Sequence, residues 1–114
     1  RCTSRGLGDV YKRQAGLGGR SQEFALAFAC QMRRAGDAAP THWAVLAGGT
    51  DGRDGPTDAA GGIFMSGQNF DLDAATNALR CHDSYGFLAT QNSLVKTGAT
   101  GTNLGDLVLI VWSK

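Results

Sequence analysis

The 114-residue chain contains no apolar run long enough to cross a bilayer. Its longest run, residues 107–112, is far shorter than the roughly 20 residues that a membrane-spanning helix needs. No stretch resembles a secretory signal. The three cysteines are too few for a disulfide framework, and they lack the spacing of a metal site. These absences predict no membrane partner and favour a reduced, cytoplasmic compartment.

No basic cluster remains once the first fourteen residues are set aside. Residues 4–14 resemble the translation of a transposase-type sequencing adapter, so residues 1–14 are interpreted as a non-native segment and excluded from the fold. The formal net charge of +1 then becomes −2, because the segment holds four basic residues and one acidic residue. We expect no nucleic-acid partner for residues 15–114. The alternative is a genuine basic arm that binds nucleic acid or an acidic partner.

The most informative segment is the glycine-rich stretch 48–61, which follows an apolar strand-like run. Glycine lets backbone N–H groups approach a ligand closely, and carboxylates bind hard cations through oxygen. Asp51, Asp54 and Asp58 are therefore candidate ligands for Mg²⁺. Residues 57–61 read as the start of a short helix capped by Thr57, which would add an anion site. The alternative is an ordinary surface turn, which uses the same residue types.

Helical and strand-like patterns alternate along the remaining 15–114. We expect one domain of the α/β class, a mixed sheet sandwiched by helices, with both polar loops on one edge of the sheet. Ser21 is the expected cap of the first helix, and Phe24, Phe28 and Met32 share one of its faces. The predicted helices and strands are, in order: helix 21–35, strand 42–47, helix 57–61, strand 62–65, helix 72–80, helix 83–88 and strand 107–112.

A second small-residue loop, 97–103, alternates glycine and threonine and can offer N–H and hydroxyl donors to an anion. It lacks the Gly-Lys-Ser/Thr ending of a P-loop. Arg20 stands at the head of the first helix, where a guanidinium can grip a phosphate or carboxylate, although a surface ion pair is the simpler alternative. Asp83 either caps a helix or binds a substrate hydroxyl.

Four motifs occur in the order found in one enzyme family. Residues 15–114 resemble the C-terminal (MOFRL) domain of class II glycerate kinases through the segments 19–26, 47–61, 82–85 and 97–107. The sequence departs from the family pattern at Ser21, where Asn is common, and at Ala99, where Pro is common. The resemblance implies the C-terminal domain of a two-domain enzyme, whose Rossmann-like N-terminal domain precedes the residues present here.

The resemblance also implies a reaction and a set of site residues. The family transfers the γ-phosphoryl group of ATP, with Mg²⁺, to D-glycerate, giving 2-phosphoglycerate, and we expect residues 15–114 alone to be inactive. The implied catalytic residues are Arg20, Asp51 and Asp54, of which Asp51 and Asp54 also bind the metal. The implied substrate- or phosphate-binding residues are Thr50, Gly52, Thr57, Asp58, Asp83, Thr100, Gly101, Thr102 and Asn103.

Two other functions stay open at this stage. The domain could be a non-catalytic anion-binding or regulatory module that needs no second domain. The family has also been labelled hydroxypyruvate reductase, which would require a dinucleotide site. No GxGxxG fingerprint follows a strand in this sequence, which disfavours the reductase.

Overall fold

The computed structural model describes residues 18–102 and 104–113. The predictions for residues 1–14 and for Asn103 therefore fall outside the described residues. The described part holds three α-helices, a short 3₁₀ turn and four strands, and the predicted α/β class is confirmed. Their bounds are α1 Arg20–Ala35, η2 Gly36–Ala38, β1 His42–Gly49, β2 Gly61–Met65, α2 Leu72–Arg80, α3 Ser84–Thr90, β3 Leu94–Val95 and β4 Asp106–Ser113.

The four strands form one sheet in the order β3-β2-β1-β4. All three pairings among the described strands are antiparallel. The prediction of a mixed sheet was therefore wrong in this detail. β1 and β2 are joined by the loop 50–60 rather than by a helix, and the path from β2 to β3 passes through two helices, so neither connection is the single-helix crossover that makes neighbours parallel.

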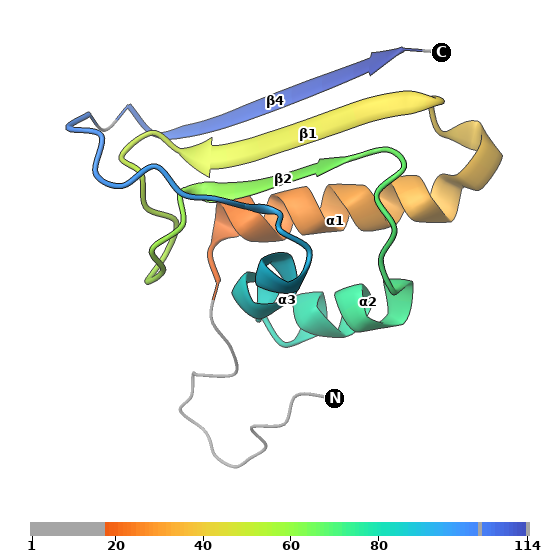
Figure 1. Ribbon diagram of the computed structural model, residues 1–114, viewed down its shortest axis with the longest axis horizontal. Coiled ribbons are helices and arrows are strands. Elements are labelled where there is room, and N and C mark those ends of the chain that lie inside the picture. Colours follow the sequence, from red (N-terminus) through yellow and green to blue (C-terminus); the bar gives the residue numbers. More distant parts are fainter. Residues whose placement is uncertain (1–17, 103, 114) are drawn as a thin grey trace.

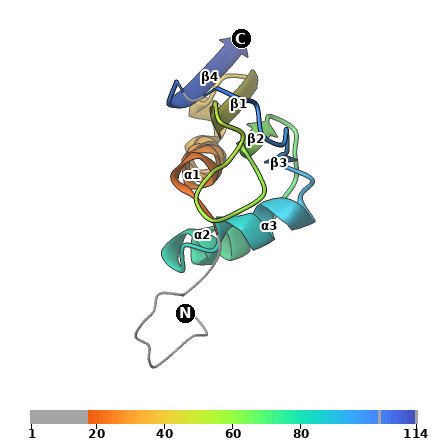
Figure 2. The ribbon, with the colours of Figure 1, turned by 90° about the vertical axis from the view of Figure 1, so that its left-hand side faces the viewer.

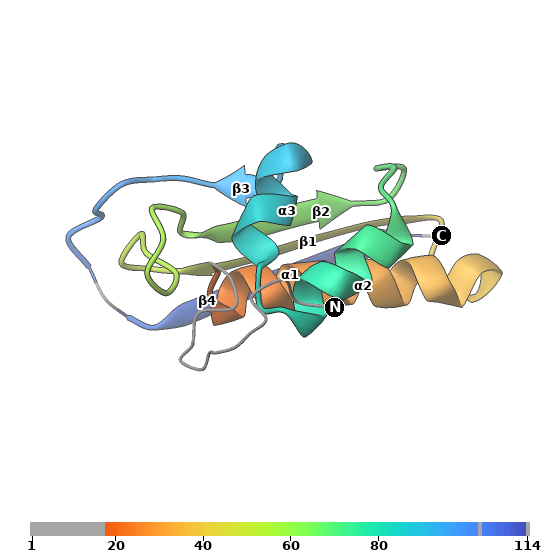
Figure 3. The ribbon, with the colours of Figure 1, turned by 90° about the horizontal axis from the view of Figure 1, so that it is seen from below.

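The helices lie on one face of the sheet instead of sandwiching it (Figures 1 and 3). α1 runs beneath β1 and β2, and α2 and α3 pack against the other side of α1. The buried core therefore centres on α1, with Leu26 and Cys30 fully enclosed and Val45 and Phe64 supplied by the sheet. α1 is therefore covered on more than one face.

Two local predictions about capping differ from the structure. No helix forms at 57–61, because the Thr57 hydroxyl accepts a hydrogen bond from Ala59 N and donates one to the Asp54 carbonyl, which closes a turn. Ser21 does not cap α1, which begins at Arg20 with Gly19 in the capping position. The capping group comes from the loop 50–60, as described below. Asp71 caps α2, accepting from Asp73 N at 3.0 Å.

Cys30 is a free, buried cysteine. Burial raises the pKa of the Cys30 thiol above its ordinary value, against the opposing charges of Arg34 and Arg33. Among the described residues, no helix combines the length and apolarity needed to cross a bilayer.

Candidate functional site

The loops 50–60 and 97–102 lie side by side at one end of the sheet (Figures 1 and 3). Thr100 donates its hydroxyl hydrogen to the Thr50 carbonyl, which ties the two loops directly. Gly52 marks the closest approach, because a Cβ at this position would lie 2.0 Å from the Gly98 carbonyl oxygen. Any larger residue would push the loops apart, and the φ of +86° at Gly52 also favours glycine. The predicted meeting of the two polar loops on one edge is confirmed.

A cavity of about 570 Å³ lies between these loops. Its floor and walls are formed by the carboxylate-bearing turn on one side and by the glycine-threonine loop on the other. The lining residues are Asp51, Gly52, Arg53, Pro56, Thr57, Asp58, Gly98 and Ala99. The cavity is open and carries polar side chains, and the loop 50–60 that lines it lies beside the N-terminal end of α1 (Figure 2).

Asp54 is buried and joins the loop to α1. Its two carboxylate oxygens accept hydrogen bonds from Ser21 N at 3.1 Å and from Gln22 N at 2.8 Å. A carboxylate at this position satisfies two of the unpaired N–H groups at a helix start and meets the positive end of the helix dipole. Asp54 is thus the cap of α1 that the sequence placed at Ser21. Both of its oxygens are engaged, which leaves little capacity for a metal ion.

Thr57 and Thr50 have hydroxyl groups that are already committed to the protein. Besides its contacts within the turn, the buried Thr57 hydroxyl accepts from Gln22 Nε2 at 2.9 Å. The Thr50 hydroxyl donates to the Gly105 carbonyl at 2.9 Å and accepts from Leu104 N and Gly105 N at 2.8 and 3.0 Å. A hydroxyl has one donor and two acceptor sites. These two side chains therefore hold the loops in place.

Asp58 belongs to a small polar cluster at the rim of the cavity. Its carboxylate accepts from the Tyr85 hydroxyl at 2.7 Å and lies 3.4 Å from Lys96 Nζ. The Tyr85 hydrogen bond, with the neighbouring lysine, holds the pKa of Asp58 below its ordinary value. The same carboxylate raises the pKa of Lys96. The cluster joins α3 and the start of the second loop to the turn that carries Asp51.

The groups that remain available at the cavity are few. Asp51 uses one oxygen to accept from Arg53 N at 3.0 Å, and its side chain is otherwise exposed. The Arg53 side chain makes no ion pair with the described residues. In the second loop, the N–H groups of Gly98, Ala99 and Gly101 donate no hydrogen bond within residues 18–102 and 104–113. Gly98 and Gly101 have φ of 72° and 78°, a backbone form found in anion-binding nests.

Arg20 lies at the same end of the sheet, at the first position of α1. Its Nε is 2.6 Å from Asp106 Oδ2, at the start of β4, and the Arg20 side chain is 81% exposed. The simpler alternative of a surface ion pair is therefore present. Such a pair occupies only part of the guanidinium, which has five N–H donors in a planar fork.

Asp83 does not share this cavity. It caps α3 by position and lines a separate hollow between α2 and α3, together with Ala78 and Phe87. Its neighbour His82 pairs through Nδ1 with Glu23 Oε2 at 2.8 Å. Thr102 donates its N–H to the Thr100 hydroxyl at 3.3 Å, within the second loop. The roles assigned to these residues and to Gly101 stay predictions.

Two residues at the rim, Arg53 and Lys96, were not among the predicted site residues. Arg53 lies between two predicted acidic site residues, so its position within the loop was an available signal. Tyr85 and Lys96 belong to different elements and come together only in the folded chain. No pattern along the sequence links them.

The Tyr85 hydrogen bond gives a direct test of this cluster. We expect Tyr85→Phe to raise the pKa of Asp58 toward its ordinary value, because the largest cause of the lowered value is removed. A carboxyl group with a lowered folded-state pKa stabilises the fold above its unfolded pKa, and that contribution disappears as the pH falls through the folded value. The variant should therefore lose less stability on acidification. NMR titration of the Asp58 carboxyl carbon measures the shift.

The control is Thr90→Val at the other end of α3, where the hydroxyl donates to the Phe87 carbonyl at 2.6 Å and accepts from Gln91 Nε2 at 3.5 Å, and makes no contact with Asp58 or Tyr85 among the described hydrogen bonds. It should leave the Asp58 titration unchanged. An unchanged Asp58 pKa in Tyr85→Phe would show that the hydrogen bond does not persist in solution.

Comparison with known proteins agrees with this geometry. The model of the MOFRL family matches residues 6–106. The chain belongs to the MOFRL family. The match begins within the segment 1–14 that was set aside, so the adapter origin of that segment stays a prediction. The chain is similar to the D-glycerate 2-kinase of Thermotoga maritima, with 38% identity over 104 residues, 88% of this chain and 24% of the relative.

Two further similarities extend the comparison. The glycerate kinase of Rattus norvegicus is 40% identical over 106 residues, covering 86% of this chain and 20% of the relative. The crystal structure of a glycerate kinase from Thermotoga maritima superposes with a TM-score of 0.75 at 37% identity, covering 91% of this chain and 25% of that one. This MOFRL chain thus spans about a fifth to a quarter of the length of the relatives it matches.

Proposed function

We propose that this MOFRL domain forms part of the active site of a glycerate kinase, which transfers the γ-phosphoryl group of ATP to D-glycerate and gives 2-phosphoglycerate. The observation that supports this most is the meeting of two polar loops around one cavity at the head of α1. In phosphoryl transfer, a protein positions the reactants and neutralises charge rather than forming covalent bonds. The reaction belongs in the cytoplasm, where ATP is supplied.

The cavity offers donors suited to a phosphate or carboxylate. We assign anion binding to the free N–H groups of the loop 97–102, assisted by the Arg53 and Lys96 side chains at the rim and by Arg20 at the head of α1. Backbone N–H groups and guanidinium forks are the donors that anions commonly find in proteins. Asp54, Thr50 and Thr57 act by holding this arrangement rather than by contacting ligand.

Of Asp51 and Asp54, the two metal ligands implied by the family resemblance, only one has an oxygen available for Mg²⁺. Mg²⁺ in kinases is usually held by one or two carboxylates together with substrate phosphates. Asp51 would hold it, since one of its oxygens makes no hydrogen bond with the described residues, whereas both oxygens of Asp54 accept from amides. No group of three or more metal-ligating side chains occurs among the described residues. When bound, the ion would offset charge on the phosphates.

The proposal is tested in a full-length enzyme. In a chimera, this chain's residues 18–113 replace the matching quarter of the Thermotoga D-glycerate 2-kinase. There, Asp51→Asn is expected to lower kcat/KM for glycerate at least about tenfold, roughly 1.4 kcal/mol of transition-state stabilisation. The matched control is Asp73→Asn, an exposed aspartate in the first turn of α2, which should change kcat/KM by less than about twofold.

The assay also distinguishes the alternative functions. Consumption of ATP with glycerate, and no oxidation of NADH with hydroxypyruvate, is expected of the chimera. Equal kinetics in Asp51→Asn and Asp73→Asn would remove Asp51 from the site. Binding of ATP or glycerate by the 114-residue chain alone, measured by calorimetry, would instead favour a stand-alone binding module.

A further inference from the structure

The edge strand β4 exposes apolar side chains on both of its faces. Leu109 and Val111 lie opposite Leu46 and Ala44 of β1 in the pairing register, so they belong to the sheet face that carries no helix. Five large apolar side chains of β4 keep 47% to 67% of their surface exposed, and only Ile110 is half-buried. The five are Leu107, Val108, Leu109, Val111 and Trp112.

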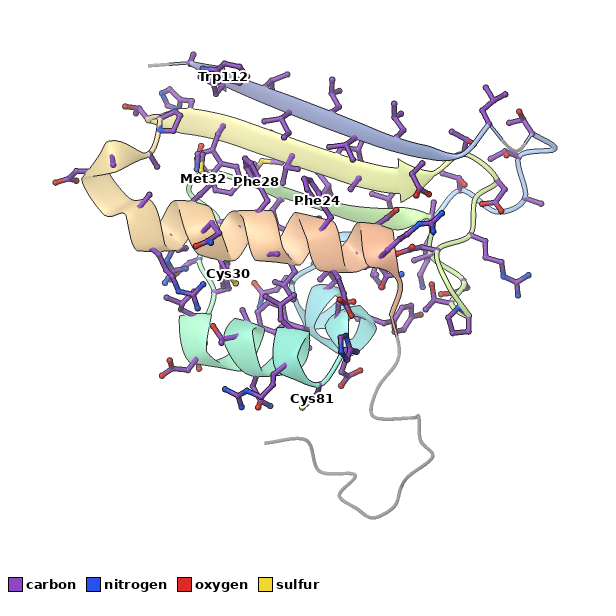
Figure 4. The ribbon with its side chains drawn as sticks, turned by 180° about the vertical axis from the view of Figure 1, so that it is seen from behind. Phe24, Phe28, Cys30, Met32, Cys81 and Trp112 are labelled. Atoms are coloured by element: carbon purple, nitrogen blue, oxygen red, sulfur yellow. The ribbon has the colours of Figure 1, made fainter. Side chains whose placement is uncertain are left out.

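The helix layer stops short of β4. α1 packs beneath β1 and β2, whereas the main contact of β4 is with β1. Phe24 and Phe28 project from α1 toward the sheet, and Phe24 is 41% exposed, because no element covers this flank among the described residues (Figure 4). Trp112 lies on β4 beyond the helices (Figure 4). The exposed apolar side chains of β4 therefore lack packing partners on both faces of the sheet among the described residues.

The backbone edge of β4 is also unprotected. β4 is the last strand of the sheet, so about half of its N–H and C=O groups point away from β1 without a strand partner among the described residues. Edge strands normally carry charges, prolines or bulges that prevent pairing with another chain. The interior of β4, Leu107–Trp112, contains none of these, and its pairing with β1 runs without interruption from Asp106 to Ser113.

We propose that β4 is an interface strand. Its free edge pairs with a strand from the polypeptide that the longer family members carry outside the region matched here, and apolar side chains of the same body cover its two faces. The relatives are four to five times longer, which provides such a body. A second copy fits less well. Pairing β4 with another β4 would close the edge, but each copy keeps α1 under its own β1 and β2, so both overhanging faces would stay bare.

This interface would align the cavity with the rest of the enzyme. β4 begins at Asp106, which pairs with Gly49 of β1 and with the Arg20 side chain. A strand docked along β4 therefore ends beside the loops 50–60 and 97–102. The inference concerns assembly alone and does not depend on which reaction the cavity supports.

Hydrogen exchange measures the pairing directly. In the 114-residue chain, the outward N–H groups of Leu107–Trp112 are expected to exchange rapidly and sedimentation velocity should give a monomer. In the full-length Thermotoga kinase, the strand that aligns with β4 should show protection factors at least about tenfold higher, because the edge is paired there. The Thermotoga chimera should show the same gain for β4 itself.

A substitution on β4 distinguishes a loss of the proposed interface from a loss of stability of the domain itself. Leu109→Lys should shift the melting temperature of the 114-residue chain little, because the side chain is already half exposed, but should abolish the β4 protection in the chimera. Ala38→Lys, at the exposed turn η2, is the matched control and should preserve protection. Equal exchange in the full-length Thermotoga kinase and the 114-residue chain overturns the proposal. A dimer of the chain with β4 protected assigns the edge to a second copy and overturns it too.

Discussion

Asp54→Ala is expected to lower the free energy of unfolding of this MOFRL domain by about 3 kcal/mol, since it removes two hydrogen bonds to a charged acceptor at a helix start. The carboxylate accepts from Ser21 N and Gln22 N, and only 4% of the residue is exposed. Alanine would leave both N–H groups buried without a partner. The loss includes the link between the loop 50–60 and α1, so the cavity should lose its shape along with its stability.

The expected loss of unfolding free energy can be compared with that for Asp71, the cap of α2. Asp71 caps α2 from an exposed position, with a single hydrogen bond to Asp73 N. Asp71→Ala should cost about 1 kcal/mol, the usual value for an exposed cap. Asp54→Asn should fall between, because the amide keeps one acceptor oxygen and turns a donor toward the second N–H group. Urea unfolding followed by far-UV circular dichroism measures all three variants.

A cost for Asp54→Ala no greater than that for Asp71→Ala would contradict the structural role. Asp54 would then be available for ligand, as the sequence alone predicted. The two hypotheses also differ in full-length kinetics, because a metal ligand can be replaced without melting α1. A fall in activity at unchanged unfolding free energy would support the metal role.

The sequence predicted the elements of this domain better than their arrangement. Helical spacing placed α1 to within one residue at its start, and α2 was predicted with its bounds, because local periodicity and capping preferences act within a few residues. The cap of α1 could not be found this way. Asp54 lies 33 residues from Ser21 in the chain, and no local pattern distinguishes it from the neighbouring aspartates.

The candidate site shows the same difference between what local sequence predicts and what long-range contacts decide. The two loops were expected on one edge because of their composition and the family resemblance, and they meet there. Which side chains face the cavity depended on long-range hydrogen bonds. Thr50, Thr57 and Thr100 have the same composition signal, yet the hydroxyls of all three are hydrogen-bonded within the protein, and only Thr57 lines the cavity. The exposure of β4 could not be predicted from its sequence, since a hydrophobic run has the same pattern whether its own domain covers it or another body does.

Arg20→Ala is expected to lower kcat/KM of the Thermotoga chimera about 100-fold, or roughly 2.7 kcal/mol, because an anion on the substrate or nucleotide would lose a charged donor in the transition state. Its effect on stability should be small. The Arg20–Asp106 pair is exposed, and exposed ion pairs contribute about 0 to 1 kcal/mol. A large kinetic effect with an unchanged unfolding midpoint therefore points to ligand binding.

The decisive control is Asp106→Asn, which removes the ion pair and keeps the guanidinium. If Arg20 binds an anion, this variant should change kcat/KM by less than about threefold, because the remaining donors of the fork still reach the ligand. If Arg20 serves only to fix the start of β4 against α1, both variants should lose activity equally. Arg20→Lys adds a third comparison, because lysine retains the positive charge but not the planar fork. If its kcat/KM is close to that of the unsubstituted chimera, Arg20 acts as a point charge. If its kcat/KM is as low as that of Arg20→Ala, the guanidinium binds a carboxylate or phosphate through two hydrogen bonds.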